Sequence, residues 1–224
     1  MKYIIHACNQ RMWYVNDFLV PSMLEQGISS DDIQIACDTE SKGNLFNTMD
    51  IFSSLPLDGE SWHLQDDVLI SSKFKEETEK DRPGIVCGIC TVYDGKAKTG
   101  IVPLENMWWS FPCIKIPNSI AKDCAYWFYN VAVKNKKNEE YQKLIKLKKY
   151  DDSFFRFFLN QYYAKIKVTN LDPNIVDHVD YLLGGSVINQ KRAQDNVSSV
   201  MWDEPELTQA LYEKIYEMCL QNNA

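Results

Sequence analysis

Two adjacent carboxylates, Asp66 and Asp67, lie in the segment Ser61–Ser71, which reads SWHLQDDVLIS. Its apolar residues predict a strand that runs into the acids, and successive strand side chains face opposite sides unless the strand ends there. At a strand end, one carboxylate can hold a divalent ion while the other orders the following loop. Mg²⁺ and Mn²⁺ prefer such oxygen ligands and bind substrate phosphates. The alternative is a pair of acids that caps the next segment or lies in solvent.

Two earlier segments also end in polar residues. Cys8 and Arg11 follow the apolar segment Lys2–Ala7, and Asp38 follows Ile33–Cys37. The guanidinium of Arg11 can stabilise negative charge on a bound ligand. Two alternatives stay open: Arg11 can pair with an acid of the next helix, and Asp38 can form an Asx turn in its loop.

These residues belong to a regular alternation of predicted strands and helices. Strand patterns cover Lys2–Ala7, Ile33–Cys37, Ser61–Ser71 and Gly84–Tyr93, and helical patterns cover Met12–Gln26 and Asn44–Leu55. In the first helix, Pro21 predicts a kink, with Ser22 and Glu25 as a capping box beyond it. The alternation predicts an α/β fold with parallel strands. Because ligands of such sheets bind beyond the carboxyl ends of the strands, a ligand should contact Cys8–Arg11, Asp38 and Asp66–Asp67.

The second half of the chain is less regular. Its predicted elements are helices at Asn118–Asn130, Asn138–Lys149, Asp151–Tyr162 and Glu204–Asn222, and a strand at Ala164–Thr169. Asp151 and Asp152 begin one of these helices, where the helix dipole favours acids. Asp152 can act as a general base, with Asp151 as the cap beside it, or can itself be an N-cap.

The chain contains three histidines. His6 and His63 fall inside predicted strands, which favours hydrogen-bonded positions in or near the core. His178 lies between Asp177 and Asp180, a spacing that provides either a metal ligand or an imidazole oriented by a carboxylate.

Composition narrows the class of protein. The 224 residues carry a net charge of −7, with 45% hydrophobic and 25% charged residues, as in an ordinary globular domain. An acidic surface disfavours general coating of nucleic acid, although the run Lys134–Lys149 is locally basic. The seven cysteines are odd in number and no secretory signal is visible, so we expect reduced thiols in a cytoplasmic protein.

The order of these motifs resembles that of GT-A fold glycosyltransferases. Trp62–Ser71 is similar to the acidic DxD-type motif at a strand end of that family, although Gln65 stands where the motif begins with an acid. HACNQRMWYV, Asp38 and GNLFNTMDIFSSL lie in the expected order. Tyr150–Leu159 and Val176–Arg192 are similar to segments of short glycosyltransferases encoded by bacteriophages and prophages.

The resemblance implies a role for each of the polar residues above. It implies donor contacts from Cys8, Arg11, Asp38 and Asp66. Asp67 and His178 would bind Mn²⁺ or Mg²⁺, and Asp151 and Asp152 would face the acceptor hydroxyl.

We therefore expect one GT-A-like domain over residues 1–224, with the nucleotide-sugar half at 1–95 and the acceptor half at 96–224. The expected enzyme transfers a sugar from a nucleotide-diphosphate donor, uridine-based, to a hydroxyl acceptor. A hydroxymethylated pyrimidine in phage DNA is one candidate acceptor. The alternatives are a nucleotidyltransferase on a related fold and a non-catalytic protein that binds a nucleotide or a partner.

Overall fold

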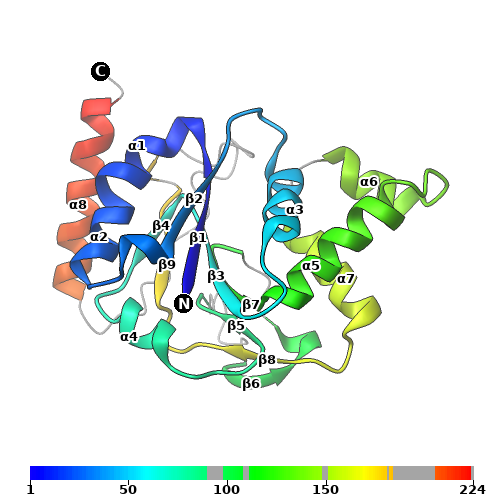
Figure 1. The fold of residues 1–224 in the computed structure, drawn as a ribbon. Helices are drawn as coiled ribbons and strands as arrows, with labels where there is room; N and C mark the ends of the chain where they lie inside the picture. Colours follow the sequence, from blue (N-terminus) through cyan, green and yellow to red (C-terminus); the bar gives the residue numbers. More distant parts are fainter. Residues whose placement is uncertain (90–97, 108–110, 148–150, 181, 184–204, 223–224) are drawn as a thin grey trace.

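Helices cover both faces of a central sheet (Figure 1). The computed structural model describes residues 1–89, 98–107, 111–147, 151–180, 182–183 and 205–222. Within these residues the sheet has seven strands in the order β2-β1-β3-β7-β5-β8-β6. The strands are β1 (Lys2–Cys8), β2 (Ile33–Asp38), β3 (Glu60–Gln65), β5 (Ile85–Cys87), β6 (Gly100–Pro103), β7 (Cys113–Pro117) and β8 (Lys167–Asn170).

The sheet is mostly parallel. β2, β1, β3, β5 and β8 run in one direction, and β7 and β6 run in the opposite direction. The predicted α/β class is therefore confirmed. The long helices are α3 (Asn44–Ser54), α5 (Asn118–Trp127), α6 (Glu139–Leu147), α7 (Asp151–Tyr162) and α8 (Pro205–Asn222), and α4 (Phe74–Glu79) is short.

Alternate residues of β1 face two separate hydrophobic clusters, as the alternation of a strand requires. Ile4 packs on the side of α3, α5 and α7, whereas Ile5 packs on the side of the first helical segment and α8. Trp127 belongs to the first of these clusters, is 4% exposed and stacks on Phe157. The two clusters hold the sheet rigidly, so the ends of its strands are fixed in space.

The helical segment after β1 changes its pitch in front of Pro21. It consists of a 3-10 turn (Asn9–Arg11), α1 (Met12–Tyr14), a π turn (Val15–Leu19) and α2 (Val20–Glu25). Because proline lacks an N–H and its ring crowds the preceding turn, the wider π turn accommodates it. The predicted capping box is wrong, since Ser22 Oγ donates to the carbonyl of Phe18 at 2.8 Å.

The predicted strand Ser61–Ser71 is wrong in its extent. β3 ends at Gln65, and Asp66 and Asp67 form a turn. β4 (Val68–Ile70) then leaves the main sheet and pairs antiparallel with β9 (Val176–His178). Because the acids lie in a turn rather than in a strand, the alternation of side chains no longer separates them.

Most other predicted elements agree with the structure within a few residues. The predicted strand Gly84–Tyr93 is β5, and its part from residue 90 onward lies outside the described residues. The predictions also missed β6, β7, β9 and α4. Among the described helices, none is long and apolar enough to cross a membrane.

A close backbone contact at Gly88 generates the first prediction. A Cβ there would lie 2.5 Å from Cys113 Sγ and 3.0 Å from Ile175 Cγ1. Gly88→Ala should therefore lower the free energy of unfolding by about 1–3 kcal/mol, as overpacking does. Urea denaturation measures the loss. In a chain that already carries Cys113→Ala, the same Gly88→Ala change should cost less stability, because the Sγ atom that crowds the new Cβ is absent. Equal stability of Gly88→Ala and the natural chain would contradict this packing.

Candidate functional site

Arg11 lies between the two adjacent carboxylates. Its Nη1 donates to Asp66 Oδ1 at 3.1 Å and also donates to Asp67 Oδ2. The side chain of Arg11 is 6% exposed and those of the acids are 9% exposed. The 3-10 turn directly after β1 brings Arg11 back over the end of β3. Sequence reasoning placed Arg11 at this edge but missed its pairing with both acids.

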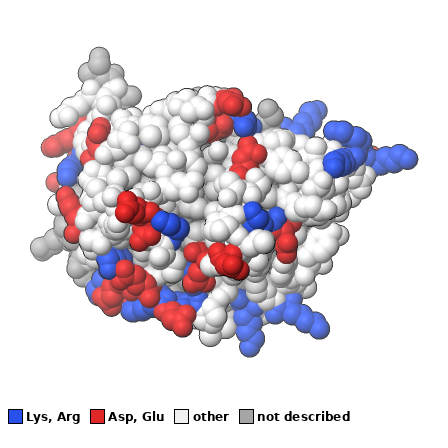
Figure 2. Space-filling model, in the orientation of Figure 1, with Lys and Arg blue, Asp and Glu red and all other residues white. Residues whose placement is uncertain are grey.

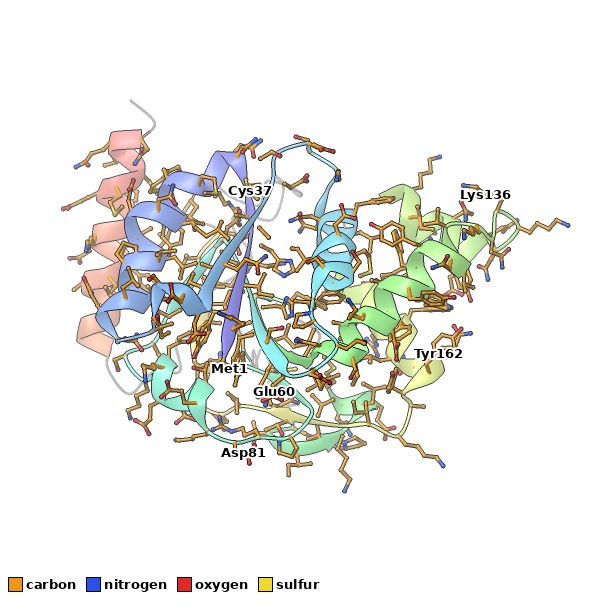
Figure 3. All side chains as sticks on the ribbon, in the orientation of Figure 1. Met1, Cys37, Glu60, Asp81, Lys136 and Tyr162 are labelled. Carbon is orange, nitrogen blue, oxygen red and sulfur yellow. The ribbon has the colours of Figure 1, made fainter. Side chains whose placement is uncertain are left out.

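Three parallel strands end at this point. Cys8 N donates to Asp66 Oδ2 at 2.7 Å, and Cys8 is the register partner of Asp38 in β2. The predicted donor residues are therefore neighbours at the carboxyl edge of β2, β1 and β3. Cys37, labelled in Figure 3, marks this edge on β2, opposite the end at which Met1 lies.

His178 reaches the same cluster from the far end of the sequence. In the small sheet Val68 is the register partner of His178, and Val179 N donates to Asp67 O at 2.8 Å. His178 Nε2 then lies 3.2 Å from Asp67 Oδ1, and its Nδ1 lies 3.8 Å from Asp180 Oδ1. The sequence predicted either a metal ligand or an imidazole oriented by a carboxylate. The structure places the imidazole of His178 between the carboxylates of Asp67 and Asp180.

The pKa values in the cluster follow from burial and from these pairs. Burial and the adjacent charge of Asp67 raise the pKa of Asp66, against the effect of Arg11. Burial also acts to raise the pKa of Asp67, but His178 and Arg11 outweigh it and hold that pKa below its usual range. For His178, burial acts to lower the pKa, and Asp67 overcomes it and raises the pKa to about 9. At neutral pH Asp67 is thus a carboxylate between two cations.

Cys8 contributes its backbone rather than its thiol. Burial, together with the charge of Asp66, raises the pKa of the Cys8 thiol to about 12. A thiol with such a pKa is protonated at neutral pH and is a poor nucleophile. The N–H of Cys8 is what binds Asp66.

The residues predicted to bind a metal ion lie together, but they do not form a metal site as they are placed. Arg11 lies where an ion shared by Asp66 and Asp67 would have to lie, and His178 directs Nε2 at Asp67. Among the described residues, no group of three His, Cys, Asp or Glu side chains is arranged to hold a metal. The predicted Mn²⁺ or Mg²⁺ stays a prediction, and no step below depends on it.

Asp38 organises the loop between β2 and α3. Its carboxylate accepts hydrogen bonds from Lys42 N at 2.9 Å and Gly43 N at 2.8 Å. Gly43 has φ +90°, a conformation that glycine adopts without strain, and α3 begins directly after it. In this structure the carboxylate of Asp38 therefore orders its own loop, as in the second of the two predicted alternatives. Its contact with a nucleotide stays a prediction.

Asp151 and Asp152 begin α7 as predicted, but their environments differ. Asp151 is 5% exposed, and its Oδ2 lies 3.1 Å from Thr48 Oγ1 on α3. Burial and the neighbouring Asp152 raise its pKa to about 7. Asp152 is half-buried, burial raises its pKa, and its Oδ1 accepts from Ser153 N at 2.6 Å. Asp152 is thus the acid nearer to solvent.

The tertiary structure adds a residue that sequence reasoning missed. Tyr212 on α8 donates a hydrogen bond from its hydroxyl to Asp177 Oδ2, next to His178. Nothing in the local sequence of α8 marks Tyr212 for this position. The C-terminal helix therefore supports the strand that carries His178.

No protein-family model and no curated protein sequence matches this chain. Among solved structures, the chain is similar to the apo form of the glycosyltransferase GlyE from Streptococcus pneumoniae TIGR4. The sequence identity is 10% and the TM-score is 0.41. The superposition covers 99% of this chain and 63% of that chain.

The buried ion cluster generates the second prediction. Arg11→Met leaves two buried carboxylates without their shared cation, which should lower the free energy of unfolding by about 3–5 kcal/mol. In that variant Asp66 loses the cation that opposes burial and the charge of Asp67, so its pKa rises further and its protonation stabilises the fold. The loss in free energy of unfolding relative to the natural chain should therefore be smaller at pH 5 than at pH 8.

Urea denaturation at the two pH values measures both effects. Lys42→Met is the matched control, since Lys42 also pairs with two carboxylates, Glu40 and Asp50, but at the surface. We expect little change from it. A deficit of Arg11→Met that is small, or that grows toward pH 5, would contradict the assigned charges.

Proposed function

We propose that this chain is a glycosyltransferase that moves a sugar from a nucleotide-diphosphate donor, uridine-based, to a hydroxyl acceptor. The observation that carries the proposal is the meeting of three parallel strand ends at one polar cluster. Open α/β sheets bind ligands at this edge. The residues that meet there are Cys8, Arg11, Asp38, Asp66 and Asp67.

Transfer of a sugar from a diphosphate places growing negative charge on the leaving oxygen. Arg11 is a permanent cation at the strand edge, and its side chain is preorganised by Asp66 and Asp67. A fixed positive group is worth more in a buried site than in water, because no solvent reorganises during the reaction. In this proposal the residues of 1–95 bind the donor and those of 96–224 form the acceptor side.

The acceptor hydroxyl needs a base, and we assign that role to Asp152. Its carboxyl group is half-buried, and burial raises its pKa. A higher pKa makes a carboxylate a stronger base, and helix α7 holds it firmly. The buried residues Phe154, Phe155 and Phe158 fix this helix against the core.

The charge of the surface bears on the class of acceptor. Lys134, Lys136 and Lys137 are exposed at the tip next to α6, which Figure 2 shows as a blue extension at the right. Lys136 is labelled at the same tip in Figure 3. This local basic tip suits a polyanionic acceptor such as hydroxymethylated DNA, whereas the net charge of −7 opposes it.

The donor experiment is a thermal unfolding panel with UDP, UDP-sugars and nucleoside triphosphates, each with Mn²⁺ and with EDTA. Saturation at about 100 times Kd stabilises the native state by about 2.7 kcal/mol, which shifts the unfolding temperature clearly. The proposal expects a shift with UDP-sugars. A shift with triphosphates alone would favour a nucleotidyltransferase, and no shift with any nucleotide would contradict both enzymes. A shift that requires Mn²⁺ would support the predicted metal ion.

The third prediction concerns Asp152. Asp152→Asn should reduce sugar transfer by about 10²- to 10⁴-fold, the range supplied by a general base. Donor binding in the thermal panel should change by no more than a few-fold, because Asp152 is assigned to the acceptor. Glu139→Gln, an acid in the first turn of α6, is the matched control and should retain activity. Full activity of Asp152→Asn with the true acceptor would leave Asp152 as a helix cap.

A further inference from the structure

A continuous chain of polar contacts crosses the core beneath the strand edge. It joins α7 to α3, β1, β3 and the start of α5, far from one another in sequence. The contacts are Asp151 Oδ2–Thr48 Oγ1 (3.1 Å), Thr48 Oγ1–His6 Nδ1 (3.3 Å), His6 Nε2–His63 Nδ1 (2.9 Å), His63 Nε2–Ser61 Oγ (3.3 Å) and Ser61 Oγ–Asn118 Oδ1 (2.7 Å). Each contact needs one proton, so the donors and acceptors along the chain are linked.

Asn118 fixes the direction of the chain at one end. Its Nδ2 donates to the carbonyl of Asp58 at 2.9 Å, so that nitrogen cannot be exchanged with Oδ1. Asn118 Oδ1 must then accept, and Ser61 must donate its hydroxyl proton to it. Toward His63, Ser61 Oγ can therefore act only as a hydrogen-bond acceptor.

The donor role of Ser61 determines the tautomers of the two histidines. Burial lowers the pKa of His6 to about 4, and burial together with His6 lowers that of His63, so both rings are neutral and carry one N–H each. His63 donates from Nε2 to Ser61, so its Nδ1 accepts from His6 Nε2. His6 Nδ1 therefore has no proton and must accept from Thr48.

The remaining contact decides the state of Asp151. Thr48 has one hydroxyl proton, and it is used on His6, so the proton between Thr48 and Asp151 must come from the acid. We infer that at pH 6 Asp151 is a neutral carboxylic acid in the folded protein and donates its proton from Oδ2 to Thr48, which ties the start of α7 to β1. Asp151 Oδ1 remains an acceptor, and it accepts from Asp152 N at 3.0 Å.

The opposite assignment leaves a contact without a proton. If Asp151 were a carboxylate, Thr48 would donate to it and His6 would carry its proton on Nδ1. His63 would then donate from Nδ1 to His6, and its bare Nε2 would face the lone pairs of Ser61 Oγ. Only a charged histidine would repair this, and burial opposes a charge at either ring.

The surroundings of Asp151 favour the neutral form. The titratable groups that face it are Asp152 on α7 and, through Thr48 of α3, His6 on β1 with His63 of β3 behind it. From α5 and the π turn after it, Trp127 and Phe128 pack on Phe154 of α7. Burial, with the repulsion of Asp152, raises the pKa of Asp151 to about 7, in agreement with the hydrogen-bond count.

Asp151 is therefore a positioning residue. It is buried, its Oδ2 is engaged with Thr48 and its Oδ1 with the N–H of Asp152, so we assign the role of base to the more exposed Asp152. This last step rests on the proposed function, whereas the protonation state does not.

The experiment is ¹⁵N NMR of the histidine rings, whose chemical shifts distinguish the two tautomers. With three histidines in the chain, a His178→Asn variant identifies the signals of His178, and the signals that remain belong to His6 and His63. At pH 6 we expect His6 and His63 both to carry their proton on Nε2. A proton on Nδ1 of His6, or a charged His6 or His63, would overturn the inference.

Variants separate the chain of contacts from the fold. Asp151→Asn retains an N–H donor for Thr48, so both tautomers should persist at pH 6 and at pH 9. In the natural chain, Asp151 should be ionised at pH 9. Thr48 should then donate its hydroxyl proton to Asp151 instead of to His6, and the proton of His6 should move to Nδ1. Thr48→Ser should behave as the natural chain. A tautomer that responds to pH equally in Asp151→Asn would overturn the assignment.

These measurements need neither donor nor acceptor. If the tautomers are as expected while the nucleotide panel shows no binding, the proposed function fails and the inference on Asp151 stands. If nucleotides bind but His6 carries its proton on Nδ1 at pH 6, the inference fails and the proposed function stands.

Discussion

The pairing of Arg11 with Asp66 and Asp67 is the interaction on which the rest of the site depends. Two adjacent carboxylates are buried at the point where the chain leaves the main sheet after β3, and such burial is tolerated only with compensating charge and hydrogen bonds. Arg11 supplies the charge, and the N–H of Cys8 supplies a further hydrogen bond. The turn after β1 and the end of β3 are therefore locked to each other, and the strand edge keeps one shape.

The small sheet of β4 and β9 extends this cluster to the C-terminal part of the chain. Antiparallel pairing places His178 opposite Val68, directly beside Asp67, and Tyr212 of α8 holds the neighbouring Asp177. Asp67 consequently lies between two cations, which explains why its pKa falls while that of Asp66 rises. Two carboxylates that are adjacent in sequence thus have different chemistry because their partners differ.

A second polar system lies on the other side of β1. The strand alternates, so Ile5 faces the cluster of the first helical segment, while His6 faces α3 and meets Thr48. The charged cluster and the neutral hydrogen-bond chain are thus separated by one strand. The first is compensated by opposite charges and the second by complete pairing of donors and acceptors, the two ways in which a core tolerates polar groups.

The sequence by itself determined the α/β class, the helices α3 and α7, and the strand edge at which Cys8, Arg11, Asp38 and the two acids meet. These features follow from local periodicity and from the rule that parallel strands end together. Only the tertiary structure decided the break of the strand at Asp66, the partners of Arg11, and the pairing of Asp151 with Thr48. Those outcomes depend on contacts between residues 55 to 103 positions apart in the chain. Local propensity carries no information about such distances, because it is the packing of whole elements that brings these side chains together.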